Sequence, residues 1–195
     1  GHLIYTLSHT KGYLFLFLHL YKHFMGYGTR LRQLLDLLPF GKKFYEEIDL
    51  KQVEEIIGSL AADKFYADLL AIGATFLDIH IKSGFSGVGY KPLLEDIMQA
   101  GVFGKATAER RIGGKLTVAA IKHGSLHYTD LLFPKKTELM KKYRLSHIRS
   151  YQLLALWIKR FFRFIRFDLN LLLIGKSIMV GKRRMKLLRN YGIIE

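Results

Sequence analysis

The stretch HLYKHFMGYGTRLRQLLDLL, residues 19–38, decides the fold of this chain. Its first part completes a helix predicted over residues 10–25, because apolar side chains recur there with the 3.6-residue helical period. Two glycines in the following MGYGT segment give the backbone the freedom that a tight turn needs. Thr29 is expected to cap a second helix, which runs to about Leu38 and stops before Pro39. The short turn predicts that the two helices form an antiparallel pair.

The remaining chain is also predicted to be helical, since no segment alternates with the period of two that a half-buried strand requires. Asp49 is expected to cap one helix and Pro92 to open another. The further helices are predicted at residues 50–57, 61–81, 93–99, 116–123, 128–133, 135–142, 151–167 and 169–189. We therefore expect an all-α fold, with a multi-helix domain over residues 1–145 and a basic amphipathic helical extension over residues 146–195.

The composition restricts the class of protein. A chain of 195 residues that is 50% hydrophobic is long enough to bury a core. The absence of cysteine excludes disulfides and thiolate metal sites and is compatible with the cytoplasm. No secretory signal pattern is present, and no apolar run approaches the roughly 20 residues that span a bilayer. We expect a cytoplasmic protein, with peripheral membrane association left open.

The positive charge is concentrated in the last third of the chain. The net charge is +15, and residues 135–195 hold 16 Lys and Arg against 3 Asp and Glu. A polyanion is the partner that such a segment favours, either nucleic acid or an anionic membrane surface.

Strongly polar residues gather around the predicted turn in an otherwise apolar region. Arg32 and Asp36 are four positions apart and so share a helix face, and Lys22 lies on the preceding helix. The residues alone leave an ordinary ion pair between helices open as an explanation. His19 and His23 have the spacing of two metal ligands, but the sequence marks no third ligand, so we favour interior, hydrogen-bonded histidines and predict no metal site.

Three stretches of the chain resemble one protein family, in the expected order. They are residues 19–38, LLEDIMQAGVFGKATAERRIGGKLTVAAIK at 93–122, and LLFPKKTELMKKY at 131–143. The family is the uncharacterised nucleotidyltransferase family, a branch of the polymerase-beta-like superfamily, and the resemblance is to its C-terminal half. It implies transfer of a nucleoside monophosphate to an unknown acceptor.

The resemblance also implies roles for individual residues. Lys22 and Asp36 take positions that serve the nucleotide site in related nucleotidyltransferases, and Arg32 is a phosphate ligand or the group that orients Asp36. Arg30 stands where the family usually has glycine and adds a second cation. Positive side chains suit such a site, because nucleotidyl transfer depends on positioning and charge stabilisation of the phosphates.

The carboxylate pair of such an active site is missing from this sequence. A polymerase-beta-like site has a Gly-Ser turn followed by Asp-x-Asp, which holds two metal ions, and no Asp-x-Asp occurs here. The spacing of Glu47 and Asp49 is similar, but they precede a helix and lack the turn. We therefore assign no catalytic residue and expect an inactive C-terminal portion. Mg²⁺ and a nucleoside triphosphate are expected only with a catalytic N-terminal half or separate subunit.

Basic helices near the C-terminus support a second hypothesis, a non-catalytic module that binds nucleic acid or an anionic membrane. The helix over 151–167 is amphipathic, and a basic cluster that we expect to be exposed follows it in the next helix. A core-packed helix with a solvated basic face remains the simpler alternative. The predicted polyanion-binding residues are Lys159, Arg160, Arg163, Arg166, Lys182, Arg183 and Arg184.

Overall fold

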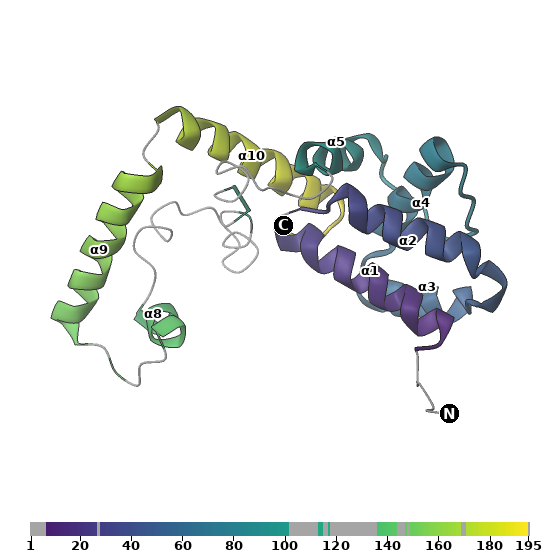
Figure 1. Cartoon of the computed structure of the whole chain (residues 1–195), viewed down its shortest axis with the longest axis horizontal. Coiled ribbons are helices and arrows are strands. Elements are labelled where there is room, and N and C mark those ends of the chain that lie inside the picture. Colours follow the sequence, from purple (N-terminus) through teal and green to yellow (C-terminus); the bar gives the residue numbers. More distant parts are fainter. Residues whose placement is uncertain are drawn as a thin grey trace, which may run out of the picture. The chain divides into compact units, whose positions relative to one another are not determined.

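The computed structural model describes residues 7–26, 28–101, 113–114, 117, 136–143, 147, 149–168 and 171–194. Every regular element among these residues is a helix (Figure 1), which confirms the all-α prediction for the described part of the chain. The elements are α1 (His9–Gly26), α2 (Leu31–Lys43), the short 3-10 helix η1 (Tyr45–Glu47), α3 (Leu50–Ser59), α4 (Asp63–Leu77), α5 (Lys91–Ala100), α8 (Lys136–Tyr143), α9 (Ser150–Asp168) and α10 (Leu171–Asn190). The helix predicted at 128–133 lies outside the described residues, as does that at 116–123 except for Thr117.

The chain divides into two compact units. Unit 1 comprises Gly1–Lys105 together with Arg184–Glu195, and unit 2 comprises Ala106–Arg183. The limits of these units do not coincide with the predicted boundary at residue 145, since unit 2 begins at Ala106 and Arg184–Glu195 belongs to unit 1.

The antiparallel helix pair is confirmed, and α1 and α2 run side by side in opposite directions (Figure 1). The start of α1 meets the end of α2 at two glycines. A Cβ at Gly12 would lie 3.2 Å from the Phe40 ring, and a Cβ at Gly41 would lie 2.7 Å from both Tyr13 and Ile81. The two helices can therefore approach this closely only because Gly41 has no side chain.

The predicted end of the second helix is wrong. Helix α2 continues through Pro39 to Lys43, although the proline ring removes the N–H that would bond to the Leu35 carbonyl oxygen. Packing outweighs the lost hydrogen bond. Leu37 and Leu38, just before the proline, are buried, and Phe40, just after it, packs on His9 and Phe44.

The loop after α4 begins earlier than the sequence predicts. Helix α4 ends at Leu77, because Asp78 adopts a left-handed conformation with φ of 51°. Ile79 and Ile81 fall within the predicted helix over 61–81, but both are buried in the segment that follows α4. Their apolar side chains fit the helical period of the sequence, although they pack into the core from a non-helical segment.

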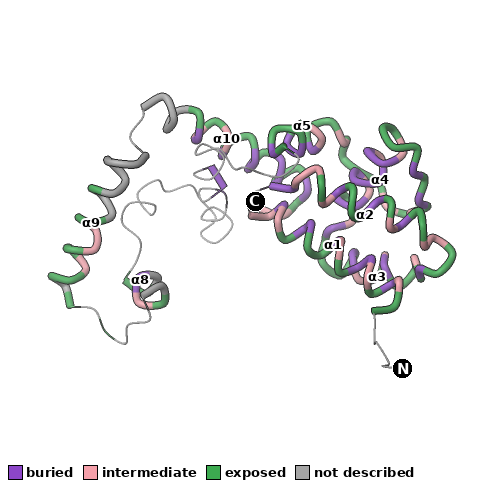
Figure 2. Tube along the Cα trace, viewed as in Figure 1, coloured by how far each residue is buried: buried purple, intermediate pink, exposed green. Residues whose placement is uncertain are grey.

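An aromatic core fills unit 1, and buried residues recur along its helices (Figure 2). The rings of Phe24 and Phe65 stack with centroids 4.2 Å apart. The hydroxyls of Tyr13 and Tyr66 lie 3.1 Å from each other, and burial raises the pKa of both, that of Tyr66 to about 12. Both phenols therefore stay protonated over the physiological range and remain available as hydrogen-bonding groups.

The C-terminal end of α10 completes this core. Arg184 is only 2% exposed, and its Nη1 lies 2.5 Å from Asp96 Oδ2 while its Nη2 donates to the Phe24 carbonyl oxygen. Tyr191 donates its hydroxyl proton to Asp68 Oδ2 at 2.8 Å. The prediction that Arg184 is an exposed, polyanion-binding residue is therefore wrong, because its guanidinium is committed to a buried carboxylate.

No helix among the described residues is both long enough and apolar enough to cross a bilayer.

We expect Asp96→Ala to lower the free energy of unfolding by about 3–5 kcal/mol, because the variant leaves the buried Arg184 guanidinium without its carboxylate partner. Thermal and denaturant melts would measure the change. The neighbouring exposed residue provides the control, and Glu95→Ala should change stability by no more than about 0.5 kcal/mol. Equal melting of the two variants would show that the buried pair does not stabilise unit 1.

Candidate functional site

The residues predicted to face a nucleotide lie around the turn between α1 and α2. Lys22 is exposed near the end of α1, and the half-buried Arg30 is the N-cap of α2. Gly28 closes the turn, since its N–H donates to the His23 carbonyl oxygen at 2.9 Å and its φ of 101° lies in the left-handed region that glycine adopts easily. The chain thereby reverses within a few residues and places both cations at one end of the helix pair.

The pKa of His23 reports the positive field at this turn. Burial lowers this pKa from its ordinary value, and the charges of His19, Arg30 and Lys22 lower it further. Lys22 and Arg30 therefore act on the same imidazole from two different helices. No functional role is predicted for His23 from the sequence, although its position next to Lys22 and four residues after His19 is a local signal. Lys22, His23 and Arg30, with Arg32 two residues after Arg30 in the first turn of α2, are called the turn cluster below.

Arg32 and Asp36 lie next to each other on α2, as their spacing predicts. Arg32 Nε is 4.0 Å from Asp36 Oδ2, and the side chains are 68% and 52% exposed. An exposed pair with this separation contributes at most about 1 kcal/mol to stability. The ion pair between these residues is thus weak, and the Arg32 guanidinium is accessible to an anion from solvent.

The start of α2 adds further positive character. The aligned peptide dipoles give a helix N-terminus a partial positive charge. Gln33 stabilises this end, because its Oε1 accepts from the Arg30 N–H at 3.1 Å. The prediction that Thr29 caps α2 is wrong, since Arg30 occupies that position. The Thr29 hydroxyl is fully buried and has no hydrogen-bond partner among the described residues.

The two histidines of α1 differ in their surroundings. Their ring centroids are 4.7 Å apart, but His19 is exposed while His23 is half-buried. The interpretation of both as interior residues is therefore wrong for His19. Among the described residues, no group of three or more His, Asp or Glu side chains is placed to hold a metal ion.

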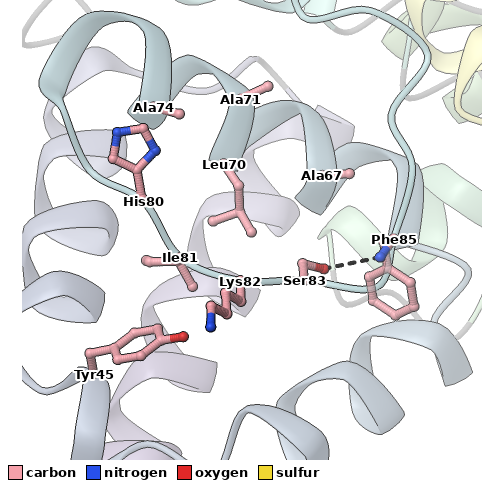
Figure 3. A pocket seen from close by; sticks show the side chains of 10 residues that line it. All are labelled: Tyr45, Ala67, Leu70, Ala71, Ala74, His80, Ile81, Lys82, Ser83 and Phe85. Atoms are coloured by element: carbon pink, nitrogen blue, oxygen red, sulfur yellow. Dashed lines mark hydrogen bonds between the residues drawn. The ribbon is translucent and has the colours of Figure 1, made fainter.

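A separate pocket of about 410 Å³ lies between α4 and the segment that follows it. Figure 3 shows Ala67, Ala71 and Ala74 along α4, with Tyr45 and Phe85 at opposite ends of the pocket. Ser83 belongs to its lining, but its hydroxyl already donates to Glu54 Oε1 at 2.6 Å. None of the predicted site residues contributes to this mostly apolar pocket.

The predicted polyanion-binding residues fall into different environments. Lys159 on α9 and both Lys182 and Arg183 on α10 are exposed, as expected. Arg184 is buried and does not belong to this group. Arg160, Arg163 and Arg166 lie within α9, but their side chains are outside the described part of the structure.

Comparisons of the chain with protein-family models, with curated proteins and with solved structures found no match.

We expect Lys22→Ala to raise the pKa of His23, because the variant removes one of the positive charges that oppose protonation of the ring. Histidine ring signals followed by NMR against pH would measure this, with His23→Gln to assign them. Lys11→Ala, at the other end of α1, should leave the His23 pKa unchanged. An unaltered pKa in Lys22→Ala would separate Lys22 from the turn cluster.

The lowered pKa of His23 also predicts how stability depends on pH. At a pH below the ordinary value of 6.5, the unfolded chain binds this proton more readily than the folded chain does. The contribution of His23 to the free energy of unfolding therefore falls as the pH drops from 7 to 5. Comparing melts of the wild type and His23→Gln at the two pH values would isolate it, and an equal loss in both proteins would contradict this expectation.

Proposed function

We propose that this chain is the nucleotide-facing helical portion of a nucleotidyltransferase, which transfers a nucleoside monophosphate to an acceptor. The observation that carries the proposal is the tight turn between α1 and α2, which the Gly28 N–H closes on the His23 carbonyl oxygen at 2.9 Å. It places Lys22 near the end of α1 and Arg30 at the N-cap of α2, and the lowered pKa of His23 agrees with this placement. The resemblance in sequence assigns the phosphates of the nucleotide to this same turn. A cytoplasmic location fits the proposal, because nucleoside triphosphates are found there and the chain contains no cysteine.

The proposed roles follow from the chemistry of each side chain. Lys22 and Arg30 act as fixed positive charges on the triphosphate, whose negative charge must be balanced for the phosphates to be held in line. Arg32 binds phosphate oxygens through its planar guanidinium, which presents paired donors that an ammonium group lacks. Asp36 Oδ2 lies 4.0 Å from Arg32 Nε, close enough to bias the direction of the guanidinium without holding it in a strong ion pair.

The proposal does not include catalysis by this chain alone. The sequence lacks the Asp-x-Asp pair that holds the metal ions in a polymerase-beta-like site. We therefore propose that the carboxylates come from a catalytic half or partner subunit, and that the residues described here bind and orient the phosphates. Binding without turnover is the activity to test on this chain.

We expect the chain to bind ATP and inorganic triphosphate, with affinity that falls as salt screens the charges. Lys22→Ala or Arg32→Ala should weaken binding by about tenfold, equivalent to ~1.4 kcal/mol. Calorimetric titration would measure this, with Lys11→Ala as the matched control because it removes an exposed lysine from the same helix α1. Equal affinity of wild type and both site variants would remove the turn cluster from nucleotide binding.

The Asp36→Asn variant tests whether Asp36 acts by orienting Arg32 or only through its negative charge. If Asp36 orients Arg32, as we propose, the neutral variant binds triphosphate more weakly although it has lost a repelling charge. A general electrostatic effect would instead tighten binding, because the site becomes more positive. The same titration decides between them, and tighter binding in Asp36→Asn would refute the orienting role.

A further inference from the structure

Helix α9 exposes large apolar side chains at regular intervals. Tyr151, Leu154, Ile158 and Phe162 are 63%, 56%, 47% and 63% exposed. Their spacings of three, four and four residues place them on one side of the helix, and we call them the apolar stripe. None of the α9 side chains that the structure describes is buried (Figure 2). Burial of a helix face in a core therefore does not account for the stripe.

The opposite side of α9 is more covered. Leu153, Leu156 and Trp157 have intermediate exposure and, at about 100° per residue, lie across the helix from the stripe. The simpler alternative from the sequence, in which Leu154 and Ile158 pack on the core, is not supported by their exposure. The helix thus has one partly covered apolar side and a second apolar side that faces solvent.

Cationic residues flank the stripe. The exposed Lys159 follows Ile158, and the sequence of α9 holds three further cations, Arg160, Arg163 and Arg166. No acidic residue occurs between Glu138 and Asp168. A surface that meets α9 from this direction must therefore be apolar along the stripe and negatively charged beside it.

We propose that α9 docks on an anionic membrane surface, with the apolar stripe at the level of the acyl chains and the basic flank among the lipid headgroups. This arrangement is that of an interfacial helix, which lies in the plane of the membrane and does not cross it. The inference rests on α9 alone and goes beyond the proposed nucleotide site in unit 1.

The charges and the exposed side chains of α9 favour an anionic membrane over a nucleic acid and over a second copy of the chain. A nucleic acid would satisfy the cations but would leave the exposed side chains of Tyr151, Leu154 and Ile158 in water. A second copy of the chain would cover the stripe but would bring two basic flanks together, and like charges repel. Anionic lipid satisfies both features at once.

Sedimentation with phosphatidylcholine vesicles, with and without phosphatidylserine, tests the proposal on the full chain. We expect binding to the phosphatidylserine vesicles, weakened by salt, and little binding to the neutral ones. The double variant Leu154→Gln/Ile158→Gln should lose about tenfold or more in binding, because it removes apolar contact without changing charge.

Phe76→Gln/Met98→Gln is the matched control, since both side chains are similarly exposed but belong to unit 1. It should bind phosphatidylserine vesicles like the wild type. Point variants are preferable to a truncation, because removing the C-terminal residues would also remove Arg184 and Tyr191 from the core of unit 1. Melts and circular dichroism would verify that both variants fold.

Three results would overturn the proposal. They are equal vesicle binding by the stripe variant and the wild type, binding of duplex RNA or DNA without binding of vesicles, and conversion of a dimer to a monomer by the stripe variant. ATP titration of the same variants keeps the two proposals separate, since changes on α9 leave Lys22 and the rest of the turn cluster intact.

Discussion

The buried Arg184 guanidinium is the contact on which the rest of unit 1 depends. It joins three helices, because it pairs with Asp96 of α5 and donates to the Phe24 carbonyl oxygen at the end of α1 while belonging to α10 itself. Its Nε has no partner among the described residues, so the two Nη contacts satisfy the charge. A buried arginine is costly to desolvate, and this one fixes which helix ends must meet rather than adding much net stability.

A second buried polar contact acts on the same end of the chain. Asp68 on α4 accepts from the Tyr191 hydroxyl through one oxygen and from the Gly89 N–H through the other. Burial and this carboxylate raise the pKa of Tyr191, which keeps its proton on the phenol as the hydrogen bond requires. A Cβ at Gly87 would lie 2.0 Å from Asp68 Oδ1, so only glycine permits the loop to pass this close.

The local sequence pattern was sufficient to predict where most of the described helices lie. Apolar periodicity located α1, and Asp49 caps α3 as predicted, with its Oδ1 accepting from the Gln52 N–H at 3.0 Å. The errors at Pro39 and in the segment after Asp78 arose where tertiary packing or a left-handed residue outweighed local preference. The turn cluster was partly predictable for the same reason, since its residues are neighbours in sequence.

Contacts distant in sequence could not be predicted. Arg184 stands beside two other cations and has the local pattern of a surface residue, while its partner Asp96 is 88 positions away. Arg184 becomes buried only when α10 packs against α1 and α5, which the local sequence does not reveal. The exposure of Leu154 and Ile158 was likewise hidden, because a helical pattern shows which residues share a side but not whether that side is covered.

Because Arg184–Glu195 belongs to unit 1, this unit cannot finish folding until these residues have been synthesised. A ribosome that adds about 5–20 residues per second needs roughly 4–18 seconds to proceed from Asp96 to Arg184, which are 88 positions apart. During that interval α1, α4 and α5 have been synthesised, but Arg184 and Tyr191, which bind Asp96 and Asp68 in the folded protein, have not. The rings of Phe24 and Phe65 therefore cannot reach their final packing against Tyr191 until the end of α10 has been synthesised.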